Sequence, residues 1–117
     1  KTPANIEQLF TPSETRPNYI FQTFLYASIM CRQQTLKVAP ALLYIHRAAS
    51  DSYSPVIEMG EPRQPKIPVN NFTFFEDEFR KRLQTLLEEI FSENEPFTQT
   101  EDIKKCSYCD FKAICKR

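Results

Sequence analysis

The chain has 117 residues, a length that suits one compact domain and is too short for two ordinary ones. Hydrophobic residues make up 41% and aromatic residues 13% of it, a composition typical of folded proteins that excludes a largely disordered chain. Fifteen Lys and Arg balance fifteen Asp and Glu, and no apolar run approaches the roughly 20 residues that span a bilayer. We therefore expect a soluble, cytoplasmic protein without membrane contact, in which any contact with nucleic acid is local.

A long helix and then a buried strand are predicted in the first half of the chain. Between residues 17 and 33 apolar side chains recur at helical spacing and predict one buried stripe, made by Ile20, Phe21, Phe24, Leu25 and Ile29. Thr15 and Pro17 supply a cap and a first-turn proline for this helix, which we expect over about 17–33. The apolar run ALLYIHR follows Pro40 and has the length of a strand, so we predict a buried strand over about 41–47.

The second half of the chain predicts a loop, a second long helix and an irregular tail. Several prolines and the only glycine lie between residues 51 and 71, which favours a loop. Thr73 and Glu76 form a capping box, and we expect a helix over about 74–91 whose apolar face is made by Phe75, Phe79, Leu83, Leu86, Leu87 and Ile90. Residues 98–117 are mostly polar and turn-forming, so we expect an irregular tail that contains three cysteines.

The cysteines of this tail, Cys106, Cys109 and Cys115, form the pattern C-x2-C-x5-C. Two thiolates separated by two residues can hold one metal from a single turn, and the third can return to the same centre. The spacing admits iron–sulfur ligands, zinc ligands or thiols without a metal. A closed site normally takes four ligands. The remaining cysteine, Cys31, lies in the first predicted helix, and its position favours a small buried core residue over a fourth ligand.

Gln22 and Tyr26 form a second candidate site. Residues four apart on a helix project from one side, so these two polar groups could reach the same phosphate or bound water. The plainer alternative places the Tyr26 ring in the core and Gln22 at its solvent edge. Neither side chain carries a charge that could hold a divalent ion.

Further polar residues carry weaker signals. Lys104, Lys105 and Lys112 surround the thiols with aromatic residues between them, a pattern that either binds a nucleic-acid backbone or forms a solvated terminus. His46 has no companion histidine and is expected to be structural. The acidic run 76–78 is explained by the first turn of the second long helix, where negative charge is favourable.

Taken in order, the Q-x3-Y helix, the strand, the long helix and the terminal C-x2-C-x5-C resemble the C-terminal part of nuclease domains of the PD-(D/E)XK superfamily, in its RecB and AddB-like branch. The resemblance covers most of the chain. It implies an α/β (α+β) fragment of a restriction-endonuclease-like fold, with helices packed on a small sheet and an irregular cysteine-containing tail. Gln22 and Tyr26 match the positions that help to place the substrate.

The resemblance also implies which parts lie elsewhere. In this branch an Asp and a D/E-x-K motif hold Mg²⁺, and iron–sulfur members take their fourth cysteine from far upstream. Both are therefore expected before Lys1, which is itself a candidate for the lysine of that motif. The implied parent is a Mg-dependent DNA exonuclease or endonuclease of a helicase–nuclease repair protein, with a 4Fe–4S cluster held by the tail cysteines.

On this interpretation DNA and a helicase domain or subunit are the partners, and the chain alone is expected to be inactive and to hold no cofactor of its own. The alternative is a non-catalytic module that binds zinc through all four cysteines, Cys31 included, and docks nucleic acid or a protein.

Overall fold

The computed structural model describes residues 2–14, 16–33 and 37–117. Over these residues the protein is mostly helical and contains a two-stranded antiparallel sheet. It divides into two compact units, Lys1–Leu87 and Glu88–Arg117, and the division falls within the last turn of the longest helix. None of the helices in the described ranges has the length and apolarity that a membrane crossing would need.

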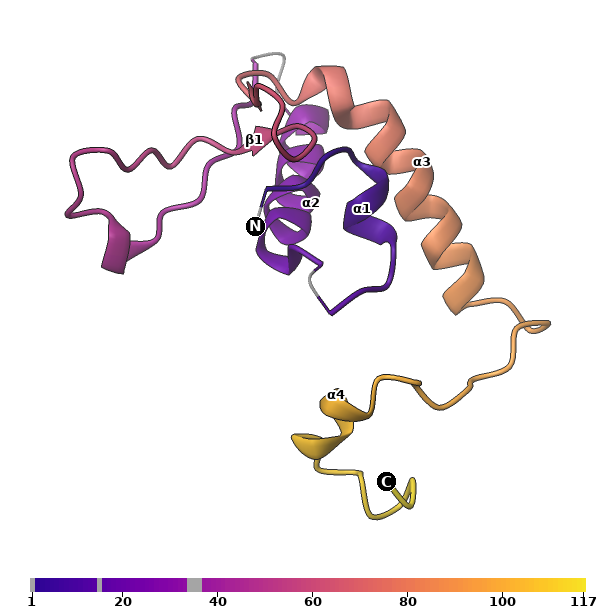
Figure 1. Ribbon diagram of the computed structural model, residues 1–117. Coiled ribbons are helices and arrows are strands. Elements are labelled where there is room, and N and C mark those ends of the chain that lie inside the picture. Colours follow the sequence, from indigo (N-terminus) through magenta and orange to yellow (C-terminus); the bar gives the residue numbers. More distant parts are fainter. Residues whose placement is uncertain (1, 15, 34–36) are drawn as a thin grey trace. The chain divides into compact units, whose positions relative to one another are not determined.

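The first unit contains three α-helices: α1 (Glu7–Phe10), α2 (Asn18–Gln33) and α3 (Thr73–Ile90), whose last turn belongs to the second unit. Figure 1 shows α1 as a short turn beside the long α2, with α3 entering after the central loops. The helices expected over about 17–33 and 74–91 are α2 and α3.

The start of α2 is set by Pro17. Its carbonyl oxygen accepts hydrogen bonds from the backbone N–H groups of Ile20 and Phe21, at 3.0 and 3.1 Å. Because proline has no N–H to donate and its φ suits a helix, it is well placed at a helix entry. Thr15, the cap expected from the sequence, lies outside the described residues.

The start of α3 depends on Asn71. Its side-chain oxygen accepts hydrogen bonds from the N–H and the hydroxyl of Thr73, at 3.2 and 2.8 Å, and so satisfies a donor that the first helical turn leaves free. Thr73, expected as the cap of a box with Glu76, is instead the first residue of the helix. The helix was placed correctly, but the capping side chain lies two residues earlier.

The sheet consists of β1 (Glu58–Met59) and β2 (Ile67–Pro68), antiparallel, with Glu58 opposite Pro68 and Met59 opposite Ile67. Gly60 follows β1 with a φ of 156°, and its N–H donates to the carbonyl of Pro3 at 3.0 Å. The small sheet expected from the sequence is thus reduced to two residues in each strand.

The strand expected over about 41–47 is wrong. Residue Ala41 makes one isolated antiparallel bridge with Val56, and Ile45–Arg47 form a short 3₁₀ helix, η1. The hydroxyl of Tyr53 accepts from the N–H of Tyr44 at 2.7 Å and donates to the carbonyl of Leu42 at 2.6 Å. The side chain of Tyr53 therefore occupies backbone hydrogen-bonding groups that a neighbouring strand would otherwise pair with. Figure 1 shows this stretch as part of a long excursion between α2 and β1, which we call the arm, residues 41–56.

The core of the first unit is aromatic. Phe24 of α2, Phe79 of α3 and Phe72, which directly precedes α3, are fully buried. The ring centroids are 5.0 Å apart for Phe24 and Phe72 and 5.8 Å apart for Phe72 and Phe79. Ile6 and Leu9 add the buried face of the α1 region. Edge-to-face aromatic pairs at these distances add to the stabilisation that burial alone provides.

The apolar stripe expected on α3 is only partly buried. Phe79 is fully buried and Phe75 and Leu83 pack against the core, but Leu87 and Ile90 are exposed. The apolar pattern of α3 continues beyond the segments that pack against the helix. Helical periodicity predicts which face of a helix is apolar, but it does not predict how far along that face other segments make contact.

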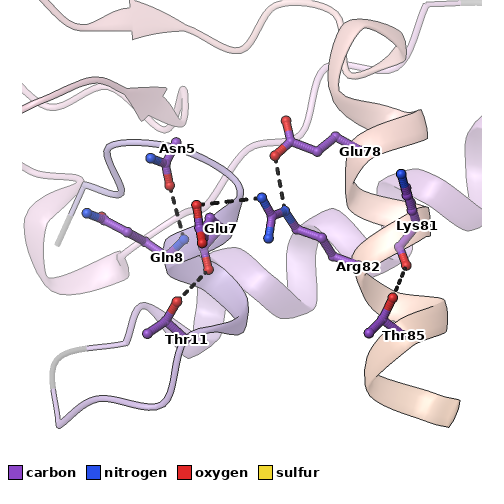
Figure 2. Close-up of polar contacts among 8 residues, drawn as sticks. All are labelled: Asn5, Glu7, Gln8, Thr11, Glu78, Lys81, Arg82 and Thr85. Atoms are coloured by element: carbon purple, nitrogen blue, oxygen red, sulfur yellow. Dashed lines mark hydrogen bonds and ion pairs between the residues drawn. The ribbon is translucent and has the colours of Figure 1, made fainter. Parts of the chain in front are cut away.

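Arg82 of α3 links two helices of the first unit (Figure 2). Its guanidinium lies 3.6 Å from a carboxylate oxygen of Glu7 in α1 and donates from Nε to Glu78 in α3 at 3.1 Å. Figure 2 also shows Thr11, at the end of α1, donating from its hydroxyl to the carbonyl of Glu7. Of the three basic residues that follow the first turn of α3, Arg80 and Arg82 thus form ion pairs.

The second unit contains α4 (Ile103–Ser107) followed by a series of turns. The side-chain amide of Gln99 donates to the carbonyl of Cys115 at 3.2 Å and accepts from Nε of Arg117 at 3.2 Å. These two bonds tie the last residues to the start of the tail. The tail is irregular, as expected, apart from the short helix α4.

Candidate functional site

Gln22 and Tyr26 meet on the surface of α2. The side-chain N–H of Gln22 donates to the hydroxyl oxygen of Tyr26 at 3.0 Å, as the i, i+4 spacing of a helix allows. Because the hydroxyl oxygen of Tyr26 accepts this bond, the hydroxyl hydrogen stays available to donate to another group. The side-chain carbonyl oxygen of Gln22 can still accept a hydrogen bond. The pair can therefore offer one donor and one acceptor, held together, to a phosphate oxygen or a water.

The face of α2 that carries this pair points away from the core of the first unit. Tyr19, Tyr26 and Ile29 follow at helical spacing and are 67%, 57% and 47% exposed. The alternative that placed the Tyr26 ring in the core is excluded. Ile29 was expected in the buried stripe, and that expectation is wrong, because Ala27 and Ser28 occupy the buried face in its place.

The three tail cysteines lie in the second unit and are not gathered into a metal site. Cys106 lies in α4, where its sulfur is 3.8 Å from the carbonyl of Asp102, and the N–H of Cys109 donates to the carbonyl of Cys106 at 3.1 Å. The N–H of Cys115 donates to the carbonyl of Phe111 at 3.2 Å. Across the described ranges, no three Cys, His, Asp or Glu side chains come together closely enough to bind a metal ion.

Cys31 lies in the last turns of α2, half-buried against the core of the first unit. Burial raises the pKa of its thiol, the nearby carboxylate of Glu76 raises it further, and a hydrogen bond with Thr73 partly opposes both effects. The raised pKa favours the neutral thiol. Its surroundings are those of a packing residue.

The acidic run at the start of α3 is used in ion pairs. Arg80 lies 2.9 Å from Asp77 and 3.9 Å from Glu76, and Glu78 is bonded to Arg82. These carboxylates are spread around the first turns of a helix and neutralised by the following arginines. A structural role explains them.

The remaining predicted site residues are placed as follows. Lys104, Lys105 and Lys112 are all exposed in the second unit, and Nζ of Lys105 lies 3.3 Å from a carboxylate oxygen of Asp102. Lys1 lies outside the described residues. His46 is exposed in η1, with its ring 6.0 Å from that of Tyr44.

Sequence reasoning missed the role of Tyr53, whose hydroxyl closes the base of the arm from 11 residues away along the chain. No local signal marks it, because a tyrosine in a proline-containing loop has no preferred partner. The arm therefore became visible only in the structure.

The sequence profile of the PD-(D/E)XK nuclease superfamily matches residues 2–116, nearly the whole chain. No curated protein and no solved structure matches at a significant level. The chain belongs to the PD-(D/E)XK nuclease superfamily.

Proposed function

We propose that this chain is the DNA-positioning part of a RecB and AddB-like nuclease domain in a helicase–nuclease repair protein. The membership of the nuclease superfamily supports a nuclease-related function. The observation that carries the finer proposal is the hydrogen-bonded pair of Gln22 and Tyr26 on an exposed helix face. Both residues match positions that place the substrate in the branch that the sequence resembles.

The chemistry of this pair is positioning. A neutral amide and a phenol cannot hold Mg²⁺, but they can fix the orientation of a phosphate or of a water molecule, and orientation alone lowers a barrier substantially. When bound, Mg²⁺ would stabilise negative charge on the phosphate and generate the attacking hydroxide. The described residues include no carboxylate cluster that fits such an ion. We therefore propose that another segment of the parent protein supplies the carboxylates.

For the tail we propose a structural role. Cys106, Cys109 and Cys115 would hold a 4Fe–4S cluster together with a fourth cysteine of the parent, and the cluster would clamp the tail without redox turnover. As the three thiols stand in this structure, they do not form a metal site. The proposal therefore requires the turns after α4 to rearrange when the cluster assembles.

The same proposal gives the exposed lysines Lys104, Lys105 and Lys112 a contact with the DNA backbone. The parent would work in the cytoplasm beside a helicase domain or subunit, which delivers unwound DNA to the nuclease. The packing of Cys31 against the core of the first unit argues against the rival zinc module, which needs this thiol as a ligand.

A cleavage and binding experiment tests the function. The purified chain with Mg²⁺ and linear DNA should give no cleavage, since its described residues form no carboxylate cluster for the ion. Its binding of a fluorescent oligonucleotide should weaken about 3- to 10-fold in Tyr26→Phe, because one neutral hydrogen bond contributes about 0.5–1.5 kcal/mol. Gln22→Ala should have a similar effect, and Gln33→Ala, an exposed glutamine in the same helix, serves as the matched control.

DNA cleavage that co-purifies with the chain would contradict the proposal, as would equal DNA binding by Gln22→Ala and Gln33→Ala.

Metal analysis tests the tail separately. Iron and sulfide bound by the parent domain, and lost in Cys109→Ser, are the expected result. Stoichiometric zinc that requires Cys31 would favour the rival module.

A further inference from the structure

Two clefts adjoin the start of α2 in the first unit. One has a volume of about 280 Å³ and is lined by Arg16, Tyr19 and Tyr44 among others, and the second, of about 330 Å³, is lined by Tyr44 and Arg47. The clefts share two wall residues, Ile20 and Tyr44. They are therefore neighbours, formed between the start of α2 and the arm.

Tyr19 connects these clefts with the Gln22 and Tyr26 pair. It precedes Gln22 by three residues and Tyr26 by seven, so all three side chains project from one face of α2. Tyr19 is 67% exposed and also lines the smaller cleft. A ligand that contacts the pair can thus continue over the ring of Tyr19 into the clefts without leaving this face.

Each cleft has one arginine. Nε of Arg16 donates to the side-chain oxygen of Asn18 at 2.9 Å, which fixes the direction of its planar guanidinium. The guanidinium of Arg47 lies 5.7 Å from the ring centroid of Tyr44. Because an arginine carries five N–H donors in a fixed fork, both side chains suit phosphate recognition.

Each cleft also has one carboxylate, Glu14 in the smaller and Glu58 in the larger. Among the described residues of each lining the charged side chains therefore balance, so they offer a bare anion little net attraction. A nucleotide of a single strand fits better, because its phosphate suits the arginine, its amino groups suit the carboxylate and its base can stack on an exposed tyrosine. A duplex keeps its bases stacked on each other and cannot use the tyrosine in this way.

We infer that the two clefts and the ring of Tyr19 form a binding groove for single-stranded DNA that leads to Gln22 and Tyr26. The inference rests on the proposed function and adds a path for the single-stranded DNA. Tyr19 supplies the stacking surface, Arg16 and Arg47 hold successive phosphates, and the arm forms the far wall. None of these residues is assigned a metal or a bond-breaking step.

Fluorescence anisotropy of the full chain with a labelled single-stranded oligonucleotide tests the groove. Tyr19→Ala should weaken binding roughly 5- to 150-fold, the range for loss of one stacked base, whereas Tyr19→Phe should bind within about twofold. Arg47→Ala should weaken binding and reduce the dependence of log K on log salt by about 0.7, the value for one phosphate contact. An unlabelled duplex and inorganic phosphate should compete poorly.

Two matched variants serve as controls. Phe74→Ala removes an exposed aromatic ring from α3, and Arg32→Ala removes an exposed charge from the last turn of α2, and neither residue lines the clefts. Circular dichroism confirms that each variant is folded. Both controls should bind as the unaltered chain does.

The groove is overturned if Tyr19→Ala and Arg47→Ala bind like the controls, or if duplex or phosphate competes as well as the single strand. It is also overturned if the unaltered chain does not bind, and the proposed function is then judged by cleavage in the parent. Weakening by Tyr26→Phe with no effect of Tyr19→Ala removes the groove and leaves the proposed function standing.

Discussion

Replacing Phe79 by Ala should strongly destabilise the first unit. The ring is fully buried, and its centroid lies 5.2 Å from that of Phe10, 5.7 Å from Phe21, 6.1 Å from Phe24 and 5.8 Å from Phe72. Large-to-small changes of this kind cost about 3–5 kcal/mol. Four rings from three segments of the chain enclose the site and cannot all move into the space, so we expect a loss of about 4 kcal/mol.

That loss is a large part of the roughly 5–15 kcal/mol by which a domain of this size is stable. Urea unfolding followed by circular dichroism measures it, and Phe79→Leu, with an expected loss of about 1–2 kcal/mol, provides a variant that still folds. Phe74→Ala, one helix turn away and 84% exposed, should change stability by less than about 0.5 kcal/mol. A loss below 1.5 kcal/mol in Phe79→Ala, about half the minimum expected, would refute the packing described for the core.

Three further changes test separate features. Arg82→Ala removes the ion pairs with Glu7 and Glu78 and should cost less than about 1 kcal/mol of unfolding free energy, with the difference vanishing in high salt. Gly60→Ala should cost about 1–3 kcal/mol in the same urea assay, because φ is 156° and a Cβ would lie 3.2 Å from a backbone oxygen. Alkylation at about pH 8, followed by mass spectrometry, should label exposed Cys109 well before Cys31, whose raised pKa lowers its thiolate fraction until the pH rises further. Equal loss from Arg82→Ala at all salt concentrations, an unchanged Gly60→Ala or simultaneous labelling would contradict these expectations.

Local rules recovered the two long helices, because helical periodicity and helix-entry residues are encoded within a few residues of each other. The same rules misjudged which side chains of α2 are buried. Ser28 is buried although it is polar, and Ile29 is exposed although it is apolar. A small side chain lets neighbouring segments approach closely, and an apolar pattern does not reveal this.

The arm shows a different limit. Residues 41–47 have the composition of a buried strand, but a strand also needs a neighbour to pair with and a layer to cover it. Here Tyr53 supplies the bonds at the base and Ile45 is left exposed. Whether an apolar run pairs is decided by distant parts of the chain, so composition could not settle it.

The two candidate sites also differ in how far local sequence determines their geometry. Gln22 and Tyr26 meet because four residues of helix bring them together, and the sequence alone predicted this spacing. Cys106 lies near the end of α4 and several turns separate it from Cys115, so their sulfurs converge only if something other than local structure draws them together. A metal would supply that force, since its binding free energy is available for folding.

The two faces of α2 connect packing with the proposed role. Phe24 is locked among aromatic rings on one side, and Tyr26, two residues on, projects from the other with its hydroxyl bonded to Gln22. Because a helix transmits orientation rigidly over so short a distance, the buried ring fixes the direction of the exposed pair. Positioning chemistry tolerates errors of only a fraction of an ångström, and side chains on a well-packed helix meet this requirement better than side chains on a loop. The aromatic core therefore serves the proposed site directly, and weakening it with Phe79→Leu should reduce DNA binding less steeply than the direct loss of Tyr26.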